Sequence, residues 1–321
     1  MNAVVVTGAA GFVGAAVSER LLARGETVVG LDNFNAYYDV ALKEARVARL
    51  AAQSGFTLVR GDLADAGTVR RLIDGVRRVV HVGAQAGVRH SIEAPFDYER
   101  SNLAGHLSVL EACRAAEVDH LVYASSSSVY GERPEGGAAF RETDAAAKPA
   151  SLYAATKRAN ELMSEAYASL YHIPQTGLRF FTVYGPWGRP DMAYYSFTRK
   201  ILAGEPIEVY GQGNMARDFT YIDDIVDGII GALDRPPLGG ENRILNIGAG
   251  RPVALMDMIS ILESALGRKA EKIFRPMQPG DVTRTSADIS ALAALTGYAP
   301  KVTLEEGLQR FVAWYRSHYS S

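Results

Sequence analysis

Cysteine, net charge and long apolar runs are all scarce in this sequence of 321 residues. Cys113 is the only cysteine, which excludes an intramolecular disulfide and a cysteine-based metal site. The 34 basic and 36 acidic residues leave a formal charge of -2, so the whole chain has no attraction toward nucleic acid or anionic lipid. No apolar run approaches the roughly 20 residues of a membrane helix, and the N-terminus lacks a signal-peptide pattern. These features predict a soluble, cytoplasmic protein with no metal and no nucleic-acid or membrane partner.

The first half alternates short β-branched runs with segments of helical periodicity. Strands are indicated by AVVVTG, TVVGLD, FTLVRGD, RVVHVGA, HLVYASS and TGLRFFTVYG, and helices are predicted over 13–24, 41–53, 64–74, 102–116 and 152–171. This alternation predicts an α/β fold with a Rossmann-type doubly wound parallel sheet. Because ligands of such sheets bind beyond the carboxyl ends of the strands, the chemistry is expected there.

Beyond Gly185 glycine and proline punctuate a mixed pattern, which predicts a smaller C-terminal α/β lobe. We expect a first domain at 1–185 and a second at 186–321, with strand-like parts of 218–250 rejoining the first. The connection 132–151 is long for a compact domain, so we interpret it as a lid or as a merely mobile segment.

A glycine motif follows the first strand and opens the first helix. In VVVTGAAGFVGAAV, Gly8, Gly11 and Gly14 allow a tight turn and let a pyrophosphate approach the helix N-terminus. A plain strand-to-helix turn is the alternative, and the strand–turn–helix spacing disfavours it. The pattern therefore predicts dinucleotide binding.

Acidic residues end the next two strands. Asp32 stands where a carboxylate binds the adenosine ribose and repels the extra phosphate of NADP, so NAD is the predicted cofactor. Asp62 could reach the adenine, or it could be a turn residue or helix N-cap. The predicted cofactor-binding set is Gly8, Gly11, Phe12, Val13, Gly14, Asp32, Asn33, Asp62, Leu63, Tyr153 and Lys157.

In SLYAATKRAN, Tyr153 stands four residues before Lys157, so both share one helix face. An ordinary face with one aromatic and one cation has the same spacing. The preceding strand ends in four serines, at 125–128, which alone are only turn formers. Together these residues predict a catalytic group. The lysine ammonium and a positive nicotinamide are expected to lower the tyrosine pKa from about 10, which makes the tyrosine a usable base.

The order of the motifs TGAAGFVG, SSSSVYG, YAATK and RFFTVYGP resembles the extended short-chain dehydrogenase/reductase superfamily. The longer strings LDNFNAYYD, AQAGVRHSIEAPFDYERSNLAG, RFFTVYGPWGRPDMA and ARDFTYIDDIVDGI are most similar to UDP-glucuronate 4-epimerases. The resemblance implies an NAD-dependent 4-epimerase that interconverts UDP-glucuronate and UDP-galacturonate through a 4-keto intermediate. It also implies a homodimer formed through the helices at 102–116 and 152–171.

The resemblance further implies residue roles. Tyr153 takes the proton of the sugar 4-hydroxyl, and Lys157 holds the nicotinamide ribose. Ser126 hydrogen-bonds the reacting hydroxyl, with Ser127 as the competing assignment. NAD is regenerated in each cycle, so we expect it to be tightly held.

For the substrate, the resemblance places Thr182 and Arg189 at the C5 carboxylate, where arginine suits a bidentate contact. A solvated loop cation is the alternative for Arg189. With Ser128, this pair is expected to hold the carboxylate out of the alignment in which a β-keto acid loses carbon dioxide. The predicted substrate-binding set is Arg89, Ser128, Thr182 and Arg189 for the sugar and phosphates, Ile207 and Val209 for uracil, and Arg217, Asp281 and Arg284 for phosphate and ribose.

Three other functions remain open. A 4-epimerase of neutral UDP-sugars differs in the role of Arg189. A decarboxylase or dehydratase is disfavoured because such relatives carry an acidic residue where this chain has Ser127 and Ser128. A non-catalytic NAD-binding protein is disfavoured because both Tyr153 and Lys157 are present.

Overall fold

The computed structural model describes residues 3–132 and 137–319, and within them the largest sheet has seven strands, all paired in parallel. Its spatial order is β10-β6-β5-β4-β1-β2-β3. The strands are β1 (Ala3–Thr7), β2 (Thr27–Asp32), β3 (Phe56–Arg60), β4 (Arg78–His81), β5 (His120–Ser126), β6 (Gln175–Phe180) and β10 (Asn242–Ile247). The order reverses between β1 and β4, which creates a crevice at the carboxyl ends of the strands. The predicted doubly wound sheet is confirmed.

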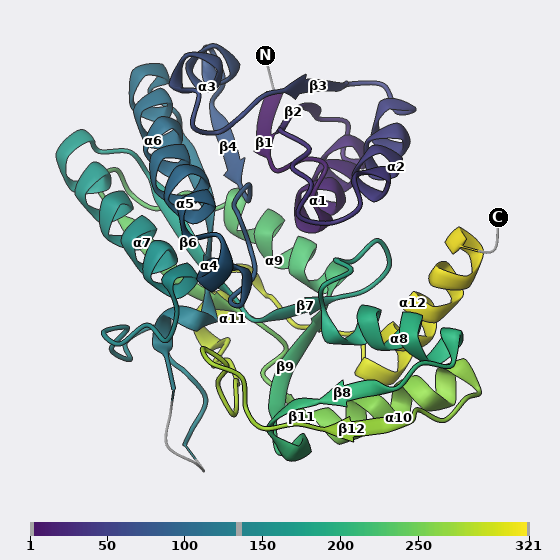
Figure 1. Ribbon diagram of the computed structural model, residues 1–321. Helices are drawn as coiled ribbons and strands as arrows, with labels where there is room; N and C mark the ends of the chain where they lie inside the picture. The colour runs from purple at the N-terminus through teal and green to yellow at the C-terminus, as the bar shows by residue number, and fades with distance from the viewer. Residues whose placement is uncertain (1–2, 133–136, 320–321) are drawn as a thin grey trace.

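Successive side chains along each strand point to opposite faces of the sheet, and a hydrophobic layer lies on each face. Val5 of β1 packs with α3 (Ala66–Ile73) and α6 (Gly105–Ala116), whereas Val4 and Val6 pack with α1 (Phe12–Ala23) and α9 (Ile222–Leu233). Two further helices cover the sheet, α2 (Val40–Ala51) beside α1 and α7 (Leu152–Tyr171) beside α6 (Figure 1). The residues predicted to be helical are confirmed to within a few positions at each end.

The second half of the chain builds a smaller set of elements below the sheet in Figure 1. One small sheet contains β7 (Thr182–Tyr184), β9 (Ala216–Tyr221) and β11 (Pro252–Ala254), and a second pairs β8 (Ile207–Val209) with β12 (Lys272–Phe274). The accompanying helices are α8 (Ala193–Ala203), α10 (Leu255–Leu266), α11 (Ser290–Thr296) and α12 (Leu304–Tyr319). Within 218–250, β10 (Asn242–Ile247) does return to the large sheet, because it pairs with β6. The division at residue 185 stays a prediction.

Short helical segments complete the description. They are α4 (His90–Glu93), α5 (Pro95–Tyr98), a π-helix (Glu99–Ala104) and two 3-10 helices (Ser127–Tyr130 and Tyr210–Gly213). Residues 133–136 of the predicted lid lie outside the described residues, so the lid stays a prediction. In the described parts of the chain, every helix is too short or too polar to cross a membrane.

Candidate active site

A cavity of about 420 Å³ runs along the carboxyl ends of the strands, from the glycine turn after β1 to the start of α7. Every residue of the predicted cofactor set lines it, and so do Ser126, Ser127, Ser128, Thr182, Arg189, Arg217 and Asp281. A second cavity beside it is lined by Arg89 and shares Thr182, Arg189, Arg217 and Asp281 with the first. The structure therefore brings most of the predicted site residues together.

The glycine turn is too tight for side chains. Gly8 has a φ of +69°, and a Cβ at Gly14 would lie 2.1 Å from the Gly8 carbonyl oxygen. Gly11 is the N-cap of α1 and supplies no side chain there. A helix N-terminus with exposed backbone and no side chain in front of it suits an approaching pyrophosphate.

Asp32 is held rigidly at the end of β2. Its side chain accepts hydrogen bonds from the backbone N–H groups of Ala10 (3.1 Å) and Phe34 (2.8 Å), and the residue is only 8% exposed. These contacts tie the carboxylate to the glycine turn. A fixed carboxylate at this point is suited to a ribose diol and opposes a phosphate group.

Asp62 accepts a hydrogen bond from Ala64 N–H (2.8 Å) and pairs with Arg100 (3.2 Å). It does not cap the following helix, because Asp65 does so by accepting from Gly67 and Thr68. The turn role weighed for Asp62 is therefore present, while the helix-cap role belongs to Asp65. Its place in the cavity wall is compatible with an adenine contact as well.

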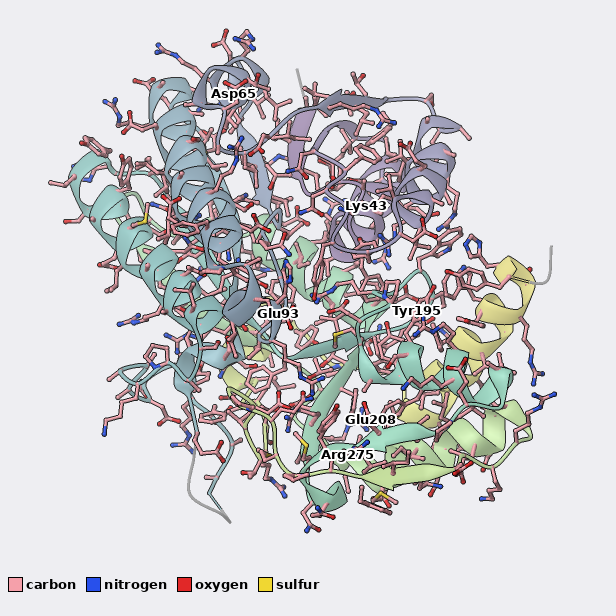
Figure 2. The ribbon with its side chains drawn as sticks, viewed as in Figure 1. Lys43, Asp65, Glu93, Tyr195, Glu208 and Arg275 are labelled. Atoms are coloured by element: carbon pink, nitrogen blue, oxygen red, sulfur yellow. The ribbon has the colours of Figure 1, made fainter. Side chains whose placement is uncertain are left out.

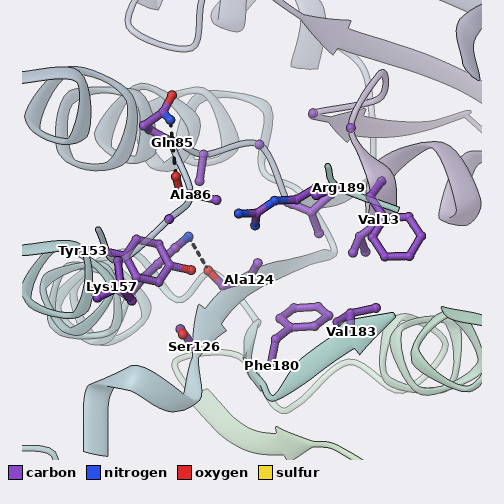
Figure 3. A pocket seen from close by; sticks show the side chains of 18 of the residues that line it. Val13, Gln85, Ala86, Ala124, Ser126, Tyr153, Lys157, Phe180, Val183 and Arg189 are labelled. Carbon is purple, nitrogen blue, oxygen red and sulfur yellow. Dashed lines mark hydrogen bonds between the residues drawn. The ribbon is translucent and has the colours of Figure 1, made fainter. Parts of the chain in front are cut away.

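Tyr153 and Lys157 lie in the first two turns of α7, one helical turn apart on the cavity side (Figure 3). Ser151 caps the helix by accepting from Ala154 N–H (3.1 Å), so α7 begins just before the tyrosine. The positive end of the helix dipole there favours a phenolate. The Lys157 Nζ donates to the Ala124 carbonyl (2.9 Å), and burial lowers the pKa of this lysine to about 8.

The protein by itself does not lower the Tyr153 pKa, so the lowering expected beside a positive nicotinamide stays a prediction. Burial raises the pKa of Tyr153, because desolvation penalises the phenolate. A hydrogen bond with Ser126 and the positive charge of Arg189 act in the opposite direction but do not overcome burial. A base at this position therefore depends on the further positive charge that a bound oxidised cofactor brings.

The four serines point to different partners. Ser125 also lines the cavity, but its hydroxyl donates to the buried Glu161 (2.6 Å). Ser126 reaches Tyr153 and also accepts from the Ser128 hydroxyl (2.9 Å). Ser127 opens the short 3-10 helix and lines the cavity wall. The geometry thus favours Ser126 over Ser127 as the partner of the tyrosine.

Arg189 extends into the cavity from the side opposite α7 (Figure 3), which favours the substrate-binding interpretation over that of a solvated loop cation. Its guanidinium binds Asp191 through two hydrogen bonds, Nε to Oδ1 (3.1 Å) and Nη2 to Oδ2 (2.5 Å). Asp191 is the main reason that the pKa of Arg189 stays above its usual range despite burial. Thr182 opens β7 in the wall of both cavities.

Charged groups also gather in the second cavity. Arg89 pairs with Asp281 (3.1 Å), and its guanidinium lies 4.9 Å from the ring centre of Tyr210. Arg217 donates to the carbonyls of Ala216 (3.0 Å) and Thr283 (3.2 Å). Burial lowers the Arg217 pKa, yet it stays far above neutral as in any arginine. This region can hold a multiply charged anion.

Three predicted substrate residues are not brought to either cavity. Ile207 and Val209 are fully buried in the hydrophobic core, so their predicted passage along the uracil is wrong. Strand alternation explains the error, because Glu208 between them faces outward, lines the second cavity and pairs with Arg275 (3.2 Å; Figure 2). Arg284 is exposed and lines neither cavity, so its predicted contact with phosphate or ribose stays a prediction.

The comparison with known proteins agrees with this geometry. The model of the NAD dependent epimerase/dehydratase family matches residues 4–248. The chain belongs to this family. A probable UDP-glucuronate 4-epimerase of Rhizobium meliloti is 45% identical, over 98% of this chain and 97% of its own length. UDP-glucuronate 4-epimerase 1 of Arabidopsis thaliana is 50% identical, over 98% of this chain and 77% of its own length.

Among solved structures, the UDP-glucuronic acid 4-epimerase of Bacillus cereus in complex with UDP-glucuronic acid and NAD superposes with a TM-score of 0.93. It is 35% identical and the match covers 99% of this chain and all of that one (100%). The family resemblance, the fold class and the NAD dependence predicted from the sequence are thereby confirmed.

The residues of this epimerase/dehydratase family member fit NAD. The glycine turn packs against the start of α1 too closely for a side chain at Gly14, and the fixed Asp32 carboxylate suits an adenosine ribose without a phosphate. Tyr153 and Lys157 stand at the far end of the same cavity. The cavity therefore suits a dinucleotide whose far end meets Tyr153.

Sequence reasoning missed several cavity residues of this family member. Tyr37 donates to Asp191 Oδ2 (3.0 Å), and both residues line the second cavity. Glu208 and Tyr210 were passed over in favour of their apolar neighbours. A signal was available for Asp191, because an acidic residue two positions after a proposed anion-binding arginine can pair with it.

Proposed function

We propose that this chain is a UDP-glucuronate 4-epimerase, which interconverts UDP-glucuronate and UDP-galacturonate. The observation that carries the proposal is the guanidinium of Arg189 in the same cavity as Tyr153, Lys157 and Ser126. This arrangement sets a carboxylate-binding group opposite an alcohol-oxidising group. The named activities of the relatives from Rhizobium, Arabidopsis and Bacillus support the same substrate.

When bound, NAD would supply a reversible hydride acceptor for C4 of the sugar. Tyr153 removes the proton of the 4-hydroxyl and returns it once the sugar has turned its other face. Ser126 hydrogen-bonds the reacting oxygen and the tyrosine, which keeps the two in line. Lys157 is fixed by the Ala124 carbonyl one helical turn from Tyr153, and its ammonium binds the nicotinamide ribose and favours the phenolate.

The absence of an acidic side chain at the serines supports epimerisation over elimination. Ser127 and Ser128 occupy the positions before Val129 where dehydrating relatives carry an acid. Without that group, an elimination lacks the acidic side chain that dehydrating relatives use, which favours re-reduction of the 4-keto sugar over dehydration.

Arg189, Thr182 and Ser128 have a second task. Oxidation of C4 makes a β-keto acid, which loses carbon dioxide when its carboxylate bond stands perpendicular to the carbonyl plane. We propose that these three side chains hold the carboxylate away from that alignment, by charge-assisted and neutral hydrogen bonds. The UDP group is assigned to the charged cluster of Arg89, Arg217 and the Asp281 loop in the second cavity.

We also propose a cytoplasmic homodimer. The single cysteine, Cys113, is buried, which fits a reducing compartment. Leu107 on α6 and Leu162, Leu170 and Tyr171 on α7 are exposed between 41% and 68% on neighbouring helices. A second copy of the chain packed against α6 and α7 removes this apolar surface from water.

The test is NMR of the purified protein with UDP-glucuronate, and with UDP-glucose in a parallel sample, without added NAD. UDP-galacturonate in the first sample alone supports the epimerase, its carboxylate preference and a retained cofactor. Conversion of UDP-glucose assigns the protein to neutral sugars, and a UDP-pentose assigns it to decarboxylation.

A further inference from the structure

Arg189 is oriented by its own loop. Asp191 binds one edge of the guanidinium, the edge made by Nε and Nη2. An arginine has a second edge that can bind a carboxylate with two hydrogen bonds, made by Nη1 and Nη2. The guanidinium that carries this second edge extends into the first cavity (Figure 3).

Tyr37 completes the arrangement from the other half of the molecule. Its hydroxyl donates to Asp191 Oδ2 (3.0 Å), the same oxygen that binds Nη2 of Arg189. Burial raises the pKa of Tyr37 to about 12, so the hydroxyl keeps its proton and remains a donor. The charge of Arg189 keeps the Asp191 pKa below its usual range, so the aspartate is ionised. The group is thus a fixed chain from Tyr37 through Asp191 to Arg189.

The backbone just before Arg189 is fixed as well. The buried Arg46 donates to the carbonyls of Trp187 (2.6 Å) and Gly188 (2.9 Å). The same guanidinium donates to the carbonyl of Ala10 in the glycine turn (3.0 Å). The loop that carries Arg189 is therefore anchored to the cofactor-binding turn, and little freedom remains for its side chain.

We propose that Asp191, assisted by Tyr37, is a positioning residue that presents the free edge of Arg189 to the carboxylate of the substrate and so sets the preference for acidic UDP-sugars. This proposal rests on the proposed function, because it takes the carboxylate of an acidic UDP-sugar as the group that Arg189 meets. The physical basis is preorganisation. A guanidinium held in its bound orientation loses less conformational entropy when the ligand arrives.

If Asp191 had the opposite role, its removal would change the affinity for UDP-glucuronate in the opposite direction. If Asp191 competed with the substrate for Arg189, removal of its charge would strengthen the binding of UDP-glucuronate. If Asp191 positions Arg189, the same change weakens it. UDP-glucose has no carboxylate, so its affinity reports any general damage to the site.

The test compares Asp191→Asn and Tyr37→Phe with the matched control Asp227→Asn. Asp227 also pairs with an arginine, Arg20, but on α9 outside both cavities. All variants carry Tyr153→Phe, so that the sugar is not converted, and each NAD-loaded protein is titrated with UDP-glucuronate and UDP-glucose by calorimetry. The measured quantity is the preference for UDP-glucuronate, which is the dissociation constant of UDP-glucose divided by that of UDP-glucuronate.

We expect Asp191→Asn to lower the preference for UDP-glucuronate by about fivefold and Tyr37→Phe by about twofold, through weaker UDP-glucuronate binding alone. Asp227→Asn leaves the ratio unchanged. A preference for UDP-glucuronate that is unchanged or increased in Asp191→Asn overturns the proposal. So does a Tyr153→Phe protein that binds UDP-glucuronate and UDP-glucose equally well. Turnover of the protein with Tyr153 intact is measured separately. Its absence, with the selectivity changes present, contradicts the epimerase reaction and leaves the role of Asp191 standing.

Discussion

At the scale of single residues, the behaviour of Tyr153 depends on opposing effects. Burial raises its pKa, whereas the Ser126 hydrogen bond and the Arg189 charge lower it. The reaction needs the deprotonated tyrosine, so the rate must rise with pH until the phenolate is formed. Each neighbour that favours the phenolate moves this rise to lower pH.

Replacement of Ser126 by alanine should therefore shift the pH profile. Loss of a hydrogen bond that favours the phenolate raises the Tyr153 pKa, so we expect the rising limb of kcat/KM to move to higher pH by roughly half to one pH unit. Profiles of Ser126→Ala and Ser127→Ala, measured side by side, check this. The same displacement in both variants, or in neither, contradicts the assignment of Ser126.

Arg189→Ala removes the cation that faces the sugar. We expect the affinity for UDP-glucuronate to fall by about 30-fold, which corresponds to the loss of about 2 kcal/mol from a charge-assisted contact. The affinity for UDP-glucose should change little, and a UDP-pentose should appear because the carboxylate is no longer held. Calorimetry and NMR of the products measure both effects. Unchanged affinity together with unchanged products would refute the role of Arg189.

At the scale of elements, the strongest signals in the sequence were periodic. The βαβ alternation, the glycine spacing and the i, i+4 pair on α7 are local, and each led to a correct placement. The failures needed tertiary information. Ile207 and Val209 alternate with Glu208, and which face of β8 meets the cavity depends on the core it packs against. The Tyr37 to Asp191 contact joins residues 154 positions apart, which no local pattern reveals.

Burial also decided the sign of an electrostatic prediction. The sequence predicts that the lysine one turn away and a positive nicotinamide together lower the Tyr153 pKa. The helix spacing was correct, but the sequence does not tell how completely the phenol is removed from water. Desolvation exceeded the effect of the neighbours in the protein alone.

The glycine turn at the start of α1 allows a prediction for the element as a whole. A Cβ at Gly14 would lie 2.1 Å from the Gly8 carbonyl oxygen, so Gly14→Ala forces α1 away from β1. We expect the free energy of unfolding to fall by about 1 to 3 kcal/mol, as for other overpacked sites, and the purified protein to lose its retained NAD.

Urea unfolding and the absorbance ratio at 260 and 280 nm measure the two effects. Gly239→Ala is the control, because its added Cβ meets an ordinary contact of 3.5 Å. A Gly14→Ala protein that keeps both its stability and its cofactor would contradict the close packing of the turn.

At the scale of the whole molecule, the exposed leucines of α7 concern assembly. Replacing Leu162 and Leu170 by glutamate puts two carboxylates into the proposed dimer contact. Burial of a carboxylate without a partner is costly. We expect the double variant Leu162→Glu, Leu170→Glu to sediment as a monomer at micromolar concentration. Tyr319→Glu, on α12 at the other side of the molecule (Figure 1), should sediment as the unmodified protein does. A double variant that is still dimeric would move the interface elsewhere.

In the proposed reaction, one hydride leaves C4 of the sugar and returns to it. The most direct measurement is NMR and mass analysis of the product formed from UDP-glucuronate carrying deuterium at C4, with no NAD added to the purified protein. The account predicts UDP-galacturonate that retains the deuterium at C4. A product with ordinary hydrogen at C4, or a UDP-pentose in place of UDP-galacturonate, would contradict it.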